Sequence, residues 1–296
     1  MIEAGSNLQN NFHLAGIVPV SGHKLDFDLP WHDSMQVIGK GYLAVERSVI
    51  ECAYAGCETI WVVCNDDIQP ILKKRMGDYI EDPYYLSKHY YVKYPLEARK
   101  QIPIFYTPIH PKDRDRRDSY GWSVLHGALT AFIMSDKVSK WLIPSRYFVS
   151  FPYGVHRHDA VAKHRKDISS NTAFFLSYKG KTVKDGEYLS FTMSAKEYND
   201  YLWNIKENCS GGSAKVHHKE RWSSKHFSLD KIFNCGKIDI SKVVEVGWYY
   251  RIDGWEGYHE YISSEESKTM IHPGKTMFGY HEYSKLLFEG ENNGSE

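Results

Sequence analysis

An apolar segment that runs into a polar loop near the start of the chain constrains its fold more than any other feature. Residues 14–20 (Leu-Ala-Gly-Ile-Val-Pro-Val) are rich in Ile and Val, which predicts a buried β-strand. The loop that follows begins Ser21-Gly22-His23-Lys24, so it offers a glycine and then a cation. In an open α/β sheet, ligands bind beyond the carboxyl ends of the strands. The junction is therefore a candidate nucleotide site, although it matches neither GxxxxGK[ST] nor GxGxxG.

Residues 42–55 and 59–64 extend this start into a βαβ unit. Val45 and Val49 recur at helical spacing in the first segment, which predicts a helix that ends at Gly56. Residues 59–64 (Thr-Ile-Trp-Val-Val-Cys) form a nearly continuous apolar run, which is typical of a central parallel strand. Strand, helix and strand in this order predict an α/β protein with a Rossmann-like, mostly parallel central sheet flanked by helices.

The later segments continue this alternation. Further strands are predicted at residues 102–107, 141–149, 171–178, 187–193 and 243–252, and further helices at residues 68–76, 124–133 and 194–208. The strands at 171–178 and 187–193 flank a glycine-bounded turn, which predicts a small antiparallel β subregion in the second half of the chain. Ser194 and Glu197 form a capping-box pattern at the start of the last of these helices.

The charge balance and the cysteines narrow the class of protein. Lys and Arg together number 37, as do Asp and Glu, so no bulk charge draws the chain to nucleic acid or membrane. No apolar run approaches the roughly 18 residues that a membrane span needs, and residues 1–12 lack a signal-peptide pattern. The five cysteines include no Cys-x-x-Cys pair, which favours reduced thiols. The expected location is the cytoplasm, or the host cytoplasm if the chain is viral.

Four segments resemble, in the same order, those of sugar-1-phosphate nucleotidyltransferases. That family has a Gly-rich loop after the first strand, a Pro-Lys-Pro segment, a Gly-Gly-Lys-Pro turn, a Gly-Thr-Ala-type helix start and a late strand that delivers an Asp. The corresponding segments here are residues 14–25 with Pro30, residues 37–41 (Val-Ile-Gly-Lys-Gly), residues 121–129 (Gly-Trp-Ser-Val-Leu-His-Gly-Ala-Leu) and residues 248–258 (Trp-Tyr-Tyr-Arg-Ile-Asp-Gly-Trp-Glu-Gly-Tyr). The resemblance covers residues 14–260.

The resemblance implies a fold of the glycosyltransferase-A kind and a specific reaction. A nucleoside monophosphate would pass from a nucleoside triphosphate to a sugar-1-phosphate or similar phosphorylated acceptor, and pyrophosphate would leave. The implied nucleotide-binding residues are Val20, Ser21, Gly22, His23, Lys24, Gly121, Trp122 and Ser123. The implied catalytic residues are Lys24, His32 and Asp253, with Asp253 also the expected ligand of a Mg²⁺ cofactor. Backbone N–H groups of residues 21–23 would help to neutralise phosphate.

The same resemblance suggests a single nucleotidyltransferase-like α/β domain at residues 14–288, between flexible tails at 1–13 and 289–296. Residues 14–155 would bind the nucleotide, and residues 156–288 would bind the sugar or other acceptor. The expected partners are a nucleoside triphosphate and a phosphorylated, sugar-like substrate. No membrane partner is expected, and a homo-oligomer is compatible with the sequence.

Two departures from the family pattern leave alternatives open. The family places an acidic residue after the middle strand, where residues 151–154 read Phe-Pro-Tyr-Gly. The Lys of Pro-Lys-Pro is also absent, and Pro30-Trp31-His32 stands there. One alternative is a catalytically degenerate nucleotide-binding or scaffold protein of the same fold. The other is a glycosyltransferase-A-type enzyme that uses a nucleotide-sugar; Asp26-Phe-Asp28 has the letters of its metal motif but lies in the first loop.

Overall fold

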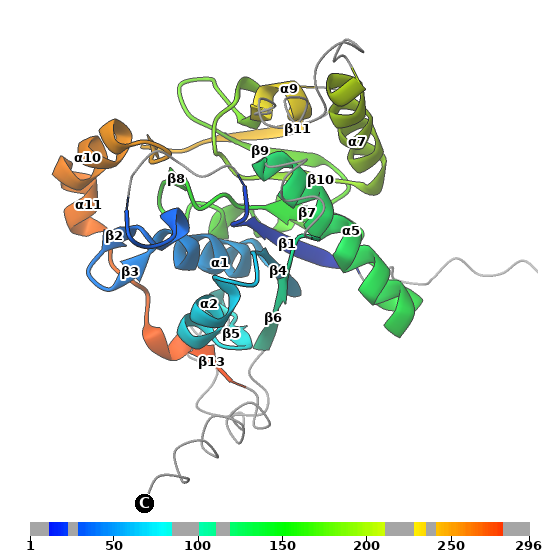
Figure 1. Cartoon of the computed structure of the whole chain (residues 1–296), viewed down its shortest axis with the longest axis horizontal. Coiled ribbons are helices and arrows are strands. Elements are labelled where there is room, and N and C mark those ends of the chain that lie inside the picture. The colour runs from blue at the N-terminus through cyan, green and yellow to red at the C-terminus, as the bar shows by residue number, and fades with distance from the viewer. Residues whose placement is uncertain are drawn as a thin grey trace, which may run out of the picture.

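A mixed sheet with parallel strands at its centre forms the middle of the protein (Figure 1). The computed structural model describes residues 12–22, 29–84, 101–110, 119–210, 228–234 and 241–280. Within these residues, nine strands form the sheet in the order β11 (Ser241–Glu245), β9 (Ala173–Ser177), β10 (Phe191–Met193), β7 (Arg146–Val149), β1 (Leu14–Pro19), β4 (Thr59–Val63), β6 (Gln101–Thr107), β5 (Tyr79–Glu81) and β13 (Phe278–Gly279).

The four central strands β7, β1, β4 and β6 are parallel to one another. Antiparallel strands flank them, with β10 on one side and β5 on the other. The predicted antiparallel pair is present as β9 and β10. Two small antiparallel ribbons complete the described strands: β2 (Val37–Gly39) with β3 (Tyr42–Leu43), and β8 (Gly154–Val155) with β12 (Tyr250–Arg251). The predicted fold class is confirmed.

The helices pack on both faces of this sheet (Figure 1). The described α-helices are α1 (Ala44–Ala55), α2 (Gln69–Met76), α5 (Tyr120–Val138), α6 (Arg165–Ile168), α7 (Ala195–Ser210), α9 (Leu229–Phe233), α10 (Trp255–Ser263) and α11 (Glu265–Thr269). Short 3₁₀ turns are η1 (Asp33–Met35), η4 (Lys140–Leu142), η5 (Ala162–His164), η6 (Val183–Asp185) and η7 (Lys275–Met277). None of the helices in the described ranges is long and apolar enough to cross a bilayer.

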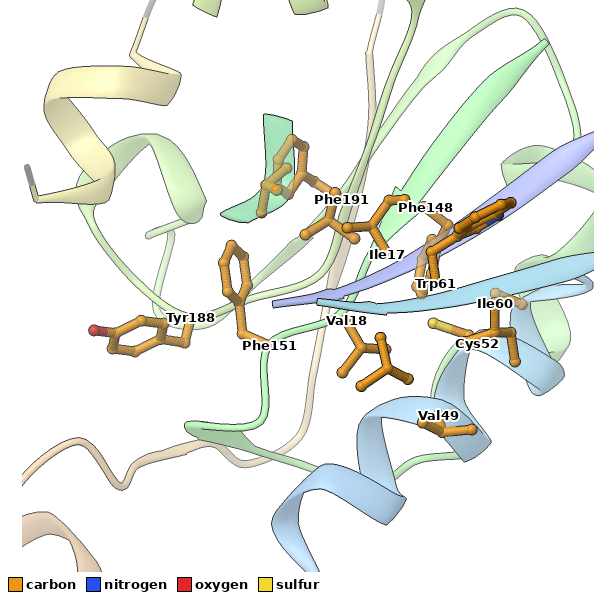
Figure 2. Close-up of a cluster of buried hydrophobic side chains, with 14 of the residues drawn as sticks. Ile17, Val18, Val49, Cys52, Ile60, Trp61, Phe148, Phe151, Tyr188 and Phe191 are labelled. Atoms are coloured by element: carbon orange, nitrogen blue, oxygen red, sulfur yellow. The ribbon is translucent and has the colours of Figure 1, made fainter. Parts of the chain in front are cut away.

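Successive residues of β1 face different helices, because side chains alternate across a strand. A Cβ on Gly16 would lie 3.0 Å from Cys52 Sγ of α1, whereas Ile17 packs against Gly127 of α5. Figure 2 shows the resulting core, with Val18 toward α1 and Ile17 among the side chains of the opposite layer. Each large apolar side chain buried in this way contributes about 1.5–3 kcal/mol. Burial on both faces therefore holds β1 at the centre.

Three details of the predicted elements change in the structure. The strand predicted at residues 141–149 is confined to β7, because η4 precedes it. The strand predicted at residues 243–252 is interrupted, so β11 and β12 pair with different partners. The predicted stop of α1 is confirmed: Gly56 has a φ of 91°, a left-handed conformation that glycine adopts without strain.

Candidate nucleotide site

The first strand delivers residues Val20, Ser21 and Gly22 to the carboxyl edge of the parallel strands. The backbone N–H groups of Val20 and Ser21 both donate to the carbonyl of Val63, at 2.9 and 2.8 Å. These bonds extend the contact between β1 and β4 beyond the end of the strand. The Ser21 N–H, expected to help neutralise a phosphate, is therefore engaged in the sheet. The Ser21 hydroxyl is buried and has no hydrogen-bond partner among the described residues.

The N-terminus of α5 lies directly beside Ser21. Ser119 caps the helix, because its Oγ accepts from the Trp122 N–H at 3.1 Å. Ser123 Oγ donates to the Ser21 carbonyl. The helix therefore begins at Tyr120, one residue before Gly121. The predicted helix of residues 124–133 had instead begun after Gly121. Strand β1 and this helix start, predicted to share one site, are in direct contact.

Gly22 packs against an aromatic cluster that the sequence did not reveal. A Cβ at Gly22 would overlap the ring of Tyr120. The Tyr120 and Tyr153 rings lie 4.8 Å apart, and Tyr188 lies 6.0 and 5.9 Å from them. Burial raises the pKa of all three phenols, and the Asp33 carboxylate adds to the rise in the pKa of Tyr120 and Tyr153. These rings are therefore neutral at physiological pH. Of the predicted loop residues, His23 and Lys24 lie outside the described residues.

His32 takes part in a local cap. Its Nδ1 accepts from the N–H of Ser34 at 3.2 Å, at the start of η1. Burial lowers the pKa of His32, although the charges of Asp33 and Asp67 oppose this shift. The imidazole is thus mainly neutral at pH 7. It does not supply the permanent positive charge that a Lys would supply there.

Asp253 reaches the same edge of the sheet through the β8–β12 ribbon. Ile252 N–H donates to the Tyr153 carbonyl at 2.8 Å, which holds the ribbon to the end of β7. Arg251 Nε donates to Asp253 Oδ2 at 2.7 Å, and the guanidinium lies 5.1 Å from the centre of the Tyr188 ring. The Tyr188 hydroxyl also interacts with the Asp253 carboxylate. A chain of contacts thus runs from Gly22 to Asp253. Gly254, not Asp253, is the N-cap of α10.

A groove of about 630 Å³ opens beside Asp253. Its walls combine tyrosine rings, cations and carboxylates, from the residues Tyr178, Lys179, Lys181, Glu187, Tyr249, Tyr250, Arg251, Asp253, Gly254, Glu256, Gly257 and Glu260. Hydroxyl groups, rings and charged groups of this kind can bind a polar, hydroxylated ligand.

Within the described ranges, the candidate Mg²⁺ ligand is not part of a preformed metal site. Among the described residues, no group of three or more His, Cys, Asp or Glu side chains could hold a metal ion. Asp253 is also paired with Arg251. Mg²⁺ is often held by one or two carboxylates together with substrate phosphates, so Asp253 is compatible with a metal that arrives on a nucleotide. Asp26 and Asp28, on which the glycosyltransferase alternative depends, lie outside the described residues.

A buried ionic network supports the end of β7. Glu51 Oε2 accepts from Arg47 at 3.0 Å, and Glu51 Oε1 lies 2.8 Å from His156 Nε2. Ser150 and Ser190 also donate to Glu51, and Arg47 donates to the Phe151 carbonyl at 2.6 Å. These bonds secure residues 150–154, which carry Tyr153 and pair with the Asp253 ribbon. The i,i+4 spacing of Arg47 and Glu51 was the signal for this network in the sequence.

Comparison with known proteins identifies the fold. No family model matches the sequence, and neither does any curated protein. A putative glucose-1-phosphate thymidylyltransferase from Bacillus anthracis, solved with sucrose, matches over 88% of this chain and 98% of its own, with a TM-score of 0.53 and 7% identity. An inositol-1-phosphate CTP transferase from T. maritima matches over 85% and 95%, with a TM-score of 0.46 and 12% identity.

The first of these comparisons shows a shared fold at very low sequence identity. The resemblance to sugar-1-phosphate nucleotidyltransferases, inferred from four short segments, is therefore confirmed at the level of the fold. The substrates and the reaction of this chain are a separate question, because one fold supports several functions.

Proposed function

We propose that this chain binds a nucleoside triphosphate and transfers its nucleotidyl group to a phosphorylated acceptor of the sugar-1-phosphate class. One observation carries the proposal: within a nucleotidyltransferase-like fold, Ser123 at the start of α5 is bonded to Ser21 at the end of β1. The N-terminus of a helix carries partial positive charge, which favours a phosphate. The Ser21 hydroxyl, which has no hydrogen-bond partner among the described residues, adjoins this turn.

The proposed reaction needs positioning and charge neutralisation more than covalent help from the protein. An oxygen of the acceptor phosphate bonds to the α-phosphorus, and the bond from that phosphorus to the bridging oxygen breaks. Pyrophosphate then leaves with the electron pair of that bond. Mg²⁺, when bound, would neutralise phosphate charge, and Asp253 is its candidate ligand. The groove beside Asp253 is the candidate acceptor site.

A second candidate function is nucleotide binding without turnover. The ion pair between Arg251 and Asp253 favours it, because a carboxylate held by a guanidinium is a weaker ligand for a metal. In that case the protein would bind a nucleotide at the same edge of the sheet and release no pyrophosphate.

A two-stage experiment tests the proposal and separates the candidates. The first stage measures thermal unfolding with ATP, CTP, GTP, UTP and dTTP, each with and without Mg²⁺; stabilisation by at least one is expected, since a ligand of the folded state raises the midpoint. The second stage measures pyrophosphate release with that nucleotide and a panel of sugar-1-phosphates. Release supports transfer, and stabilisation without release supports the second candidate. If no nucleotide raises the unfolding midpoint, both are wrong.

A further inference from the structure

The groove beside Asp253 carries charges of opposite sign on two of the elements that line it. The hairpin turn after β9 contributes Lys179 and Lys181, and helix α10 contributes Glu256 and Glu260. Among the described residues, none of these four side chains forms an ion pair with another side chain. The groove therefore presents charge of both signs that a ligand can neutralise.

The hairpin turn holds its two lysines at the rim of the groove. Tyr178 and Lys181 exchange backbone hydrogen bonds at 2.9 and 3.0 Å, so Lys179 and Gly180 form a two-residue turn between them. Lys179 has a φ of 50°, in the left-handed region that residues other than glycine seldom adopt. A turn this short fixes the backbone of both lysines relative to β9.

The two carboxylates of α10 lie on one face of the helix, one turn apart. Like charges at this i,i+4 spacing destabilise a helix unless a cation offsets them. The partial positive charge of the helix N-terminus accounts for Glu256, which is in the first turn, but it falls off before Glu260. A cationic group of a bound ligand, placed between Glu256 and Glu260, would offset both charges.

Close packing fixes these carboxylates relative to Arg251. A Cβ at Gly257 would overlap the Arg251 carbonyl, so α10 packs directly on β12. The Arg251 guanidinium pairs with Asp253, the candidate Mg²⁺ ligand just before the helix. At 1.5 Å per residue, Glu256 and Glu260 lie roughly 3 and 9 Å along α10 from its N-cap. A ligand with a phosphate beside Asp253 can therefore reach this face of the helix with a group only a few bonds away.

The charges of the groove do not suit a ligand that is only anionic. The described lining holds four carboxylates and three cations: Glu187, Asp253, Glu256 and Glu260, and Lys179, Lys181 and Arg251. The pair between Arg251 and Asp253 takes one of each, which leaves more carboxylates than cations. A phosphate without a positive charge elsewhere adds repulsion at these carboxylates. An ammonium group is instead attracted by carboxylates and by the faces of tyrosine rings, which also line the groove.

We propose that the acceptor carries an amine as well as its phosphate, and that Glu256 and Glu260 bind this amine as an ammonium group. The phosphate lies toward Arg251 and the hairpin lysines, beside Asp253. Amino sugar-1-phosphates and phosphorylated amino alcohols have this chemistry. This acceptor class rests on the proposed function, because the groove serves as the acceptor site only if transfer takes place beside Asp253.

Two matched pairs of ligands test the amine. Glucosamine-1-phosphate is compared with glucose-1-phosphate, and phosphoethanolamine with ethyl phosphate. Isothermal titration calorimetry of the full chain measures each with Mg²⁺, alone and with the α,β-methylene analogue of each nucleoside triphosphate. The amine member of at least one pair is expected to bind about tenfold more tightly or better, as a charge-assisted hydrogen bond provides. The pair that shows the preference identifies the kind of acceptor.

The uncharged analogue and the equal-affinity outcome complete this test. N-acetylglucosamine-1-phosphate, whose amide carries no charge, is expected to lose the advantage of glucosamine-1-phosphate. Equal affinities within both pairs, a preference for the members without an amine, or no binding of any of the four ligands overturns the proposal.

Variants of α10 test where the amine binds. The double variant Glu256→Gln, Glu260→Gln is expected to remove the preference for the amine. Glu265→Gln is the matched control, because it alters an exposed carboxylate of α11 that is paired with Lys268, and it should keep the preference. Lys181→Gln is expected to weaken both members of a pair equally, because the phosphate lies on its side of the groove. A preference that survives in the double variant overturns the binding of the amine by α10. Circular dichroism checks the folding of each variant.

Pyrophosphate release tests the reaction separately from the amine. A preference for the amine without release from any nucleotide supports this ligand chemistry and contradicts nucleotidyl transfer. Release that is equally efficient with glucose-1-phosphate and glucosamine-1-phosphate, together with equal affinities in both pairs, supports transfer and overturns the amine. The two failures are thus distinguishable.

Discussion

Ser21 is the residue at which strand β1 meets the start of α5. Its hydroxyl is buried and has no hydrogen-bond partner in the part of the chain that the structure describes. An unsatisfied buried polar group costs about 1–3 kcal/mol. Ser21→Ala is therefore expected to leave the free energy of unfolding unchanged, or to raise it by about 1 kcal/mol, while weakening triphosphate binding.

Ser123→Ala is the matched control for this change, measured by urea unfolding. That variant loses the bond to the Ser21 carbonyl, so it should lower the free energy of unfolding by about 1 kcal/mol. If Ser21→Ala instead destabilises the unliganded protein and leaves nucleotide affinity intact, its hydroxyl has only a packing role.

Gly22 is required by the close approach of the Tyr120 ring. Gly22→Ala would force the ring to move within a cluster that includes Tyr153 and Tyr188. Overpacking of this kind typically costs about 1–3 kcal/mol. We expect a lower urea midpoint and weaker nucleotide binding. Gly247→Ala is the control, because no atom lies within 4 Å of a Cβ at that position; equal effects of the two variants would contradict this account.

Asp253 is the residue at which turnover is most directly tested. Asp253→Asn is expected to abolish Mg²⁺-dependent pyrophosphate release, because the amide is uncharged and binds the ion weakly. The control is Asp159→Asn, which removes a carboxylate paired with the exposed Arg157 elsewhere in the second half of the chain. Full activity of Asp253→Asn would remove this residue from the catalytic site, and binding measurements would show whether nucleotide affinity survives.

At the scale of elements, the Arg47–Glu51–His156 network joins α1 to β7, β8 and β10. Although burial opposes it, the attraction of His156 and Arg47 lowers the pKa of Glu51 to about 2. The unfolded chain therefore binds this proton at higher pH than the folded protein does. The stability that Glu51 contributes is complete above its ordinary pKa of about 4.5 and is lost as the pH falls toward 2.

Glu51→Gln is expected to lower stability at pH 7 by about 3–5 kcal/mol, as breaking a buried ion pair does. It should also flatten the fall in stability between pH 4.5 and 2.5, measured from urea midpoints. Burial also lowers the pKa of His156, so the unfolded chain binds that proton at a higher pH than the folded protein does. Further stability is therefore lost as the pH falls below 6.5. Glu245→Gln, an exposed carboxylate on β11, is the control. If the stability of Glu51→Gln falls between pH 4.5 and 2.5 as steeply as that of the unaltered protein, this assignment is contradicted.

At the scale of the whole molecule, α5 connects two surfaces of different character. Its first turn lies at the candidate nucleotide site, and its last turns expose apolar side chains. Val138→Ala, on the last turn, is therefore expected to keep the full nucleotide-induced rise in the unfolding midpoint. Thermal unfolding with and without nucleotide measures this rise. Loss of the nucleotide effect in this variant would show that the site depends on the far end of the helix.

Much of the fold was predictable because its elements have local signals. The period of the apolar residues predicted β1, α1 and β4, and Ser194 and Glu197 predicted the capping box that opens α7, where Ser194 N–H donates to Glu197 Oε2 at 2.7 Å. The breaks around η4 and between β11 and β12 were missed, because apolar and aromatic residues continue through both. The prediction that Gly121 precedes α5 was wrong, because the helix begins at Tyr120 and Ser119 provides its cap.

The sequence by itself determined the βαβ start of the chain and the class of the sheet, and it predicted a ligand site at the carboxyl edge of the parallel strands. Strand and helix periods are properties of neighbouring residues, and parallel strands align their carboxyl ends. Only the tertiary structure decided which side chains meet at that edge. The Tyr120–Tyr153–Tyr188 cluster, the pairing of Asp253 with Arg251 beside it, and the Glu51 network join segments up to 139 residues apart. Such contacts depend on how buried surfaces dock, and no local pattern encodes them.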